Sequence, residues 1–301
     1  MASAPQVAFF SPFGAAFGVD LGACLQRVVD SGWYVLGPQV REFETAFARY
    51  VGVRHAVGVA NGTDALTLAL RALGIQPGQR VLTVANAGCY SSTAMAQVGA
   101  DPGWVDVDPA RLTMAPEALA AALAEGRVAA VIVTHLYGQM ADMPRLTALC
   151  QAAGVPLIED CAQAHGAALH GRRAGAWGTL ACFSFYPTKN LGALGDGGAV
   201  LTDDAALAER LRALRQYGWT RKYEVGLPGG GNSRLDELQA AVLLAKLPHL
   251  EAANAERRAI AAGYSAAFAG LPLDCPPPPG PDHAMHLYVV RTPHRAALQA
   301  H

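Results

Sequence analysis

Residues 128–160, VAAVIVTHLYGQMADMPRLTALCQAAGVPLIED, contain the pattern that decides the fold. Two short apolar runs, 129–134 and 155–159, enclose a stretch with helical periodicity over 143–153. Asp142 stands directly before that stretch, where the N-cap of a helix is expected. A strand, a helix and a second strand in this order are the repeating unit of a parallel sheet covered by helices. The sequence therefore predicts an α/β fold.

The same alternation extends over residues 55–205. Further strands are expected at 55–59, 80–84, 104–107, 180–185 and 198–201, and further helices at 63–73, 91–98 and 116–124. The last two strands follow each other without a helix between them, so part of the sheet is expected to be antiparallel. The result is a mixed, mainly parallel sheet between two layers of helices.

Beyond residue 203 the pattern changes. We expect a helix to residue 215, a glycine-rich break at 229–231, and a long helical stretch over 234–269 that Pro248 bends. A stiff linker at 276–281, a strand at 286–291 and a helical turn from residue 293 follow. One strand and a helix fragment do not complete a two-layer domain. We therefore divide the chain into an N-terminal segment (1–50), a large domain (51–245) and the start of a truncated small domain (246–301).

The composition excludes several classes of protein. The 301 residues include 23 Lys and Arg against 24 Asp and Glu, and no basic run indicates a nucleic-acid partner. Every apolar run stops well short of the ~20 residues of a membrane-spanning helix, and the first residues do not resemble a secretory signal. The six cysteines have neither metal-binding nor disulfide spacing. We expect a cytoplasmic protein.

Three polar clusters follow predicted strands, where α/β sheets bind ligands. Asn61-Gly62-Thr63-Asp64 opens a helix whose free N–H groups favour a phosphate, although a simple N-cap explains the same residues. Residues 159–166, EDCAQAHG, contain an acid that could bind Mg²⁺, cap a turn or pair with a ring nitrogen. Residues 184–190, SFYPTKN, place a lysine among small residues, although many such lysines are simply solvated.

Taken together, the three clusters provide what pyridoxal phosphate requires. The cofactor needs an anchor for its phosphate, a carboxylate for its pyridine nitrogen and an amine for its aldehyde. The carboxylate keeps the ring nitrogen protonated, so that the ring can accept an electron pair. The amine also carries a proton to and from the substrate, which requires a lowered pKa.

Five segments carry a more specific resemblance, and they occur in the same order along nearly the whole chain. They are 37–44 (GPQVREFE), 61–66 (NGTDAL), 159–166, 184–198 and 231–241 (GNSRLDELQAA). They resemble the DegT/DnrJ/EryC1/StrS family of sugar aminotransferases. The resemblance implies the fold type I arrangement of pyridoxal-phosphate enzymes, with a large αβα domain, a smaller domain and active sites shared across a homodimer. It also implies a nucleotide-linked ketosugar as substrate and glutamate or glutamine as amino donor.

The resemblance also assigns roles to residues. Lys189 matches the lysine that binds the cofactor, and Asp160 matches the acid that faces the pyridine nitrogen; these are the candidate catalytic residues. The other predicted cofactor-binding residues are Gly62, Thr63 and Ser184 at the phosphate, Gln163 near the phenolic oxygen, and Asn232, which reaches the phosphate of the neighbouring subunit. No metal ligand is expected, because the histidine pairs lack supporting ligands at the required spacing.

Two segments bear on specificity. Where relatives carry an aromatic residue that stacks on the cofactor, this sequence has Gly88, and Tyr90 two residues later is expected to take the role; half-buried packing is the alternative for Tyr90. Asn232-Ser233-Arg234 in place of Asn-Tyr-Arg favours a 3-keto over a 4-keto sugar. The presence of Lys189 argues against the dehydratase branch, where a histidine replaces it.

A second hypothesis comes from the end of the chain. Relatives continue past residue 301 into a segment near the sugar, so the alternative function is a truncated cofactor-binding or regulatory protein without full catalytic activity. A dehydratase that uses the same cofactor is a weaker alternative.

Overall fold

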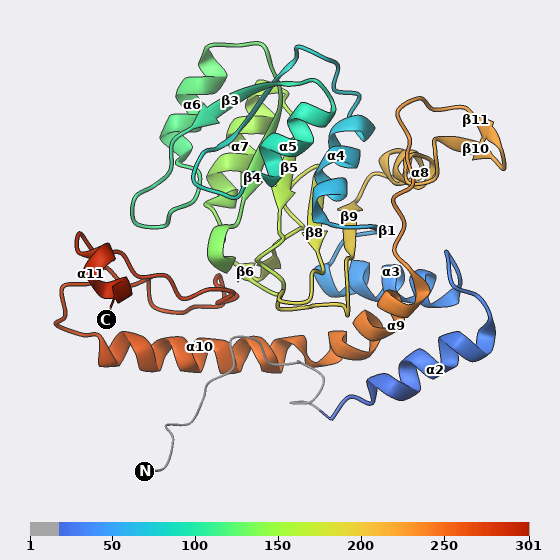
Figure 1. Ribbon diagram of the computed structural model, residues 1–301. Helices are drawn as coiled ribbons and strands as arrows, with labels where there is room; N and C mark the ends of the chain where they lie inside the picture. The colour runs from blue at the N-terminus through green and yellow to red at the C-terminus, as the bar shows by residue number, and fades with distance from the viewer. Residues whose placement is uncertain (1–17, 301) are drawn as a thin grey trace.

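The computed structural model describes residues 18–300, which fold around one seven-stranded sheet (Figure 1). In spatial order the strands are β1 (His55–Val59), β9 (Gly198–Thr202), β8 (Leu180–Ser184), β5 (Leu157–Asp160), β4 (Val128–Thr134), β2 (Arg80–Val84) and β3 (Asp101–Val105). Strand β9 runs antiparallel to both of its neighbours, and all other pairs are parallel. The predicted mixed sheet is confirmed, and β1, β8, β5, β4, β2 and β3 all end at the same edge.

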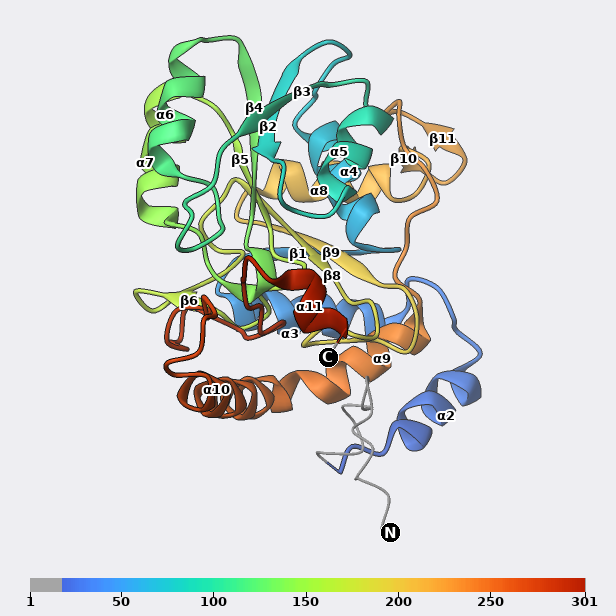
Figure 2. The same cartoon turned by 60° about the vertical axis from the view of Figure 1, so that its left-hand side comes forward.

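Helices cover both faces of the sheet, as Figure 2 shows from the side. One face packs against α4 (Gly62–Ala72), α5 (Tyr90–Gln97) and α8 (Ala205–Leu214). The other packs against α3 (Pro38–Val51), α6 (Pro116–Ala124), α7 (Met143–Ala153) and α9 (Glu237–Lys246). Each layer buries its own apolar core, so the predicted αβα sandwich is confirmed.

Local sequence signals set several of these helices. Asp142 caps α7 by accepting from the Arg145 backbone N–H, as predicted, and α7 ends at Gly154 in the left-handed conformation that favours glycine. Helix α3 buries Phe43 and Phe47, whose rings meet Phe183 and Phe185 edge to face at centroid distances of 4.9–5.3 Å. This aromatic cluster supports the end of β8, directly before the Lys189 loop.

The long helical stretch after residue 234 is bent as predicted. Helix α9 ends at Lys246, a 3-10 turn over Leu247–His249 contains Pro248, and α10 (Leu250–Ala267) continues beyond it. Proline lacks the N–H that an unbroken helix requires, which explains the bend. The remaining elements are α2 (Leu21–Ser31), α11 (Arg295–Ala300), a 3-10 turn at Leu136–Gly138, and the short strands β6 (Ala168–Leu169), β7 (Arg172–Arg173), β10 (Trp219–Arg221) and β11 (Glu224–Val225).

One predicted element is wrong. Residues 286–291 do not form a strand; their one β-bridge joins Asp274 and Arg291. A strand requires a neighbour along its length, and the segment instead donates from the His286 backbone N–H to the Tyr137 carbonyl. Helix α11 confirms the predicted helical turn.

Between residues 18 and 300, no helix is both long and apolar enough to cross a bilayer.

Candidate active site

A cavity of about 390 Å³ lies where β1, β5 and β8 end. It is lined by Asn61, Gly62, Thr63, Leu66, Tyr90, Asp160, Ala162, Ser184, Tyr186, Thr188, Lys189 and Asp196. Six of the eight predicted site residues are therefore brought together from segments that are spread over more than a hundred residues of the chain. A larger cavity beside Arg80 and Glu125 lies at the opposite, amino ends of the strands, where sheets of this kind do not bind their ligands.

The turn after β1 has the geometry of a phosphate cradle. The Asn61 side chain accepts from the Asp64 N–H at 2.8 Å and its carbonyl accepts from the Ala65 N–H at 3.0 Å. Within residues 18–300, no acceptor binds the N–H groups of Gly62 and Thr63 at the start of α4. A side chain at position 62 would lie 2.7 Å from the Ser184 Cβ, so glycine is required for this close approach. These groups fit a phosphate.

Asp160 ends β5 and is 6% exposed. Its carboxylate accepts from the Thr134 hydroxyl at 3.3 Å and from the Ala162 N–H at 3.2 Å. Burial raises the pKa of Asp160, and the Ala162 N–H and the positive charge of Lys189 offset part of that rise. The carboxylate has few partners for a buried acid and lines the cavity, so it fits a protonated ring nitrogen.

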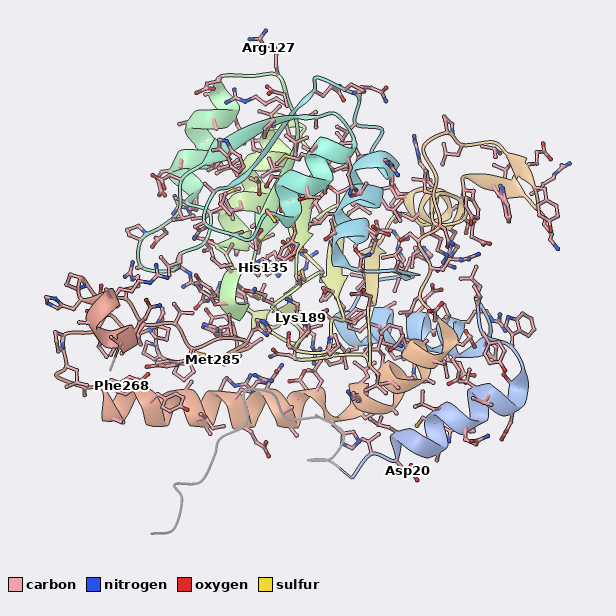
Figure 3. All side chains as sticks on the ribbon, in the orientation of Figure 1. Asp20, Arg127, His135, Lys189, Phe268 and Met285 are labelled. Carbon is pink, nitrogen blue, oxygen red and sulfur yellow. The ribbon has the colours of Figure 1, made fainter. Side chains whose placement is uncertain are left out.

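Lys189 lies on the loop between β8 and β9, and Figure 3 places it between the strand ends and α10. The loop closes through hydrogen bonds from Phe185 N–H to the Gly197 carbonyl and from Ala193 N–H to the Phe185 carbonyl. Burial lowers the pKa of Lys189, while the Asp160 carboxylate raises it. An amine with a lowered pKa is suited to covalent and proton-transfer chemistry.

Tyr90 lines the same cavity from the start of α5. A Cβ on Gly88 would lie 2.6 Å from the Tyr90 Cε2 atom, so the tyrosine ring occupies the space beside Gly88. The ring is 57% exposed, which leaves it accessible to a planar ligand.

Gln163 and Asn232 do not line the cavity. The Gln163 side-chain oxygen accepts from the Tyr137 N–H at 2.5 Å, at a residue whose φ of 61° is in the left-handed region. Asn232 is exposed and forms a β-bridge with Gln216. Their predicted roles at the cofactor stay predictions.

Comparison with known proteins identifies the family. The model of the DegT/DnrJ/EryC1/StrS aminotransferase family matches residues 19–301. The chain belongs to this family. The predictions of the family and of an aminotransferase are confirmed, and this aminotransferase has the fold type I architecture of its structural neighbours.

Three similar proteins illustrate the relationship. The dTDP-3-amino-3,4,6-trideoxy-alpha-D-glucose transaminase of Streptomyces venezuelae is 46% identical over 304 residues, which cover 100% of this chain and 80% of that protein. The crystal structure of S. venezuelae DesV with a ketimine intermediate gives a TM-score of 0.94 at 46% identity, over 99% of this chain and 81% of that one. NtdA of Bacillus subtilis, solved with bound cofactor PMP, gives a TM-score of 0.88 at 27% identity, over 98% of this chain and 70% of that one.

The aminotransferase site has an important neighbour that sequence analysis did not single out. The Glu159 carboxylate is fully buried and accepts from His135 Nε2 at 3.0 Å and from three backbone N–H groups, those of Gly175, Trp177 and Gly178. His135 Nδ1 accepts from the Ala141 N–H, which puts the ring proton on Nε2. Although Cys161 lies close to both side chains, these hydrogen bonds already use the lone pairs that a metal ion would need.

The cavity also contains Tyr186, Thr188 and Asp196, which sequence analysis did not assign. The sequence did contain a signal for these residues, because all three lie within the 184–198 segment that carries the family resemblance.

Proposed function

We propose that this chain is a pyridoxal-phosphate-dependent aminotransferase that moves an amino group from glutamate or glutamine to a nucleotide-linked ketosugar. The observation that carries the proposal is one cavity lined by a buried acid, Asp160, a half-buried amine, Lys189, and the free N–H groups of Gly62 and Thr63. When bound, the cofactor supplies an aldehyde that receives amino groups and a ring that accepts an electron pair.

Two residues carry the chemistry. Lys189 Nζ would hold the cofactor through its aldehyde, and the same amine would move a proton to and from the substrate carbon. Burial lowers the pKa of Lys189, which favours the uncharged form of the amine that a base requires. The Asp160 carboxylate holds the proton of the pyridine nitrogen in place, and its low number of hydrogen-bond partners leaves it an acceptor site for that N–H.

The remaining site residues orient the cofactor. Gly62, Thr63 and Ser184 bind the phosphate, because the N-terminus of α4 offers N–H groups and Ser184 offers a hydroxyl. Tyr90 stacks on the ring from its position over Gly88. Gln163 stays near the phenolic oxygen in this proposal, anchored by its bond to the Tyr137 N–H. Residues 51–245 form the cofactor domain and 246–301 belong to the small domain.

The keto group is proposed at position 3. The S. venezuelae relative is named for a 3-amino product, and the Asn232-Ser233-Arg234 segment resembles that of the branch acting on 3-keto sugars, with Ser233 in place of a tyrosine. Ser233 is 4% exposed and its Oγ accepts from the Ala60 N–H at 3.2 Å, so it ties this segment to the phosphate turn. A tyrosine side chain in that buried position would have to displace this contact.

The active protein is proposed to be a homodimer. Large apolar side chains are exposed at Trp33, Tyr34 and Val35, after α2, and a monomer rarely leaves such a group uncovered. The exposed Asn232 would then complete the phosphate site of the partner. A mixture of Lys189→Ala and Asn232→Ala proteins tests this: hybrid dimers contain one site with both native residues, so mixing is expected to restore activity that neither variant has alone.

A half-reaction tests the function. Adding glutamate to the cofactor-loaded protein is expected to release 2-oxoglutarate and convert the cofactor spectrum to that of pyridoxamine phosphate. Borohydride treatment before glutamate is expected to attach the cofactor to the peptide containing Lys189. A labelled lysine without any half-reaction would favour the non-catalytic alternative, and a label on another peptide would refute the assignment of Lys189.

Matched sugars then test the substrate. A dTDP-linked 3-keto sugar and its 4-keto isomer are offered to the pyridoxamine form, and the 3-keto sugar is expected to gain nitrogen. Preference for the 4-keto isomer would refute the proposed position. Loss of oxygen without gain of nitrogen would indicate a dehydratase.

A further inference from the structure

Asn190, directly after Lys189, is the centre of a buried hydrogen-bond network. Its side-chain nitrogen donates to the Asn254 Oδ1 at 2.8 Å and to the Ala284 carbonyl at 2.7 Å. Its side-chain oxygen lies 3.0 Å from His286 Nδ1. The residue is 1% exposed. The lysine loop is therefore tied to α10 and to the segment 284–286, which are far away in sequence.

The hydrogen-bond partners fix the tautomer of His286. Asn190 uses both amide hydrogens on Asn254 and Ala284, so its oxygen is an acceptor and His286 Nδ1 must donate. Burial lowers the pKa of His286 to about 3, and the positive charges of Lys189 and Arg257 contribute in the same direction. The ring is therefore neutral at physiological pH, with its proton held on Nδ1.

Helix α10 holds the other end of the network. Asn254 is fully buried and its side-chain nitrogen donates to the His165 carbonyl at 2.7 Å. His165 belongs to the same segment as Asp160, five residues after it. One chain of hydrogen bonds therefore links the loop that carries Lys189 with the segment that carries Asp160.

Helix α9 supports the same loop further along. The Lys246 Nζ atom donates to the Gly192 carbonyl at 2.9 Å, and the Gln239 side chain accepts from the Leu194 N–H at 2.8 Å. These bonds restrain the loop beyond residue 191. Next to Lys189, the loop is joined to other elements by the hydrogen bonds of the Asn190 side chain.

We propose that Asn190 and His286 are positioning residues for the reaction: their hydrogen bond, together with Asn254, holds the Lys189 amine at a fixed distance from Asp160. This inference rests on the proposed function of Lys189. The expected consequence of breaking the bond is a more mobile and better hydrated amine. The effect should fall on the chemical step more than on substrate binding, because misplacement of a reacting group by about 1 Å can cost about 100-fold in rate.

A matched pair of variants at His286 tests the proposal. Asparagine places a side-chain N–H where the histidine has Nδ1. Leucine has a side chain of similar shape to asparagine but no hydrogen-bond donor. We expect H286L to lower kcat about 10- to 100-fold with little change in KM, and H286N to retain most of the rate. N190L also removes the bonds to Asn254 and Ala284, so it is expected to lower kcat at least as much as H286L. The double variant N190L/H286L should be no worse than N190L alone, since N190L already breaks the bond to His286.

The second readout requires neither cofactor nor turnover. In the full-length, cofactor-free chain, the rate at which an amine-reactive reagent labels Lys189 is measured against pH and quantified by peptide mass spectrometry. Better hydration restores the charged form of the amine, so H286L is expected to move the labelling curve to higher pH and to reduce labelling about 3- to 10-fold near pH 8. H286N should keep the wild-type curve. The exposed His294 provides a control, H294L, that should leave the curve unchanged.

Two results would overturn the proposal. One is that H286N and H286L lose the same amount of activity. The other is that H286L lowers the melting temperature while the Lys189 labelling curve stays in place, which would make the network merely structural. Failure of the proposed function is distinguishable, because the wild-type chain would then lack the half-reaction whatever the labelling of its variants.

Discussion

Glu159 and Asp160 are adjacent acids on β5, both buried, and they differ in almost every other respect. Successive side chains of a strand point to opposite faces, so the two carboxylates have separate surroundings. Glu159 accepts four hydrogen bonds, from His135 and three backbone N–H groups. Asp160 accepts two, at 3.2 and 3.3 Å, and lines the cavity with Lys189.

The difference separates a structural acid from a functional one. A buried carboxylate is tolerated when donors replace its lost hydration, and the donors around Glu159 do so. The same hydrogen bonds hold the 175–178 loop and the His135 ring against the end of β5. Asp160 lacks that compensation within the described chain, and a buried acid with spare acceptor capacity beside a cavity is the arrangement expected of a cofactor partner.

The largest expected effect is at the amine that faces Asp160. Lys189→Ala should lower transamination by at least about 10⁴-fold, because the residue is bound covalently and also moves the proton. The melting temperature of the cofactor-free protein should change little. Steady-state kinetics and thermal melts measure both, with the exposed Lys222→Ala as control. Substantial activity in the alanine variant would refute the role of Lys189.

The next effect separates the two acids by activity. Asp160→Asn should lower kcat about 10²- to 10³-fold, because an amide cannot hold the ring nitrogen protonated. The variant should still bind cofactor, and its cofactor-free form should be at least as stable as the wild type, since the variant buries no charge at this position. Cofactor titration, kinetics and urea unfolding test these points together. Wild-type kinetics would mean that the ring nitrogen has another partner.

Glu159→Gln should show the opposite pattern. The amide group turns a donor toward N–H groups that need an acceptor, so the free energy of unfolding should fall by about 3 kcal/mol. The fraction that remains folded should keep activity within a few-fold of the wild type. Urea unfolding measures the loss, and Glu117→Gln at an exposed ion pair is the matched control. A stable but inactive variant would make Glu159 part of the chemistry.

Sequence predicts the elements of this fold well where the signal is local. The strands at 55–59 and 80–84 and the helices at 116–124 and 143–153 coincide with the structure, because periodicity, caps and prolines act within a few residues. The strand at 286–291 failed because a strand also depends on a neighbour, and no local pattern encodes whether one is present.

The same distinction holds in the site. Gly62, Asp160 and Ser184 could be placed together because parallel strands end at one edge of a sheet. The network around Asn190 could not, since its partners Asn254 and His286 are 64 and 96 residues away on elements with no repeating relation to the sheet. Three of the four partners of Glu159 are likewise backbone groups of a loop, which carry no side-chain signal.

The smallest effect concerns the pH dependence of stability. Burial raises the pKa of Asp160 in the cofactor-free chain, so the folded state binds this proton more tightly than the unfolded state does. The resulting contribution to stability is fully present below the unfolded pKa of about 3.9 and is lost as the pH rises through the higher folded value. Asparagine does not titrate, so the Asp160→Asn variant loses no stability over that pH range.

Asp160→Asn should therefore gain stability relative to its parent between about pH 4 and pH 7, by about 1.4 kcal/mol for each unit by which the pKa is raised. Urea unfolding of both proteins in a Lys189→Ala background measures this without a contribution from the lysine. His165 and His286, whose pKa values burial lowers to about 3, destabilise both proteins below about pH 6.5 to a similar extent and largely cancel in the difference. A difference that stays flat with pH would mean that Asp160 is as well compensated as Glu159, and the contrast between the two acids would then be one of position alone.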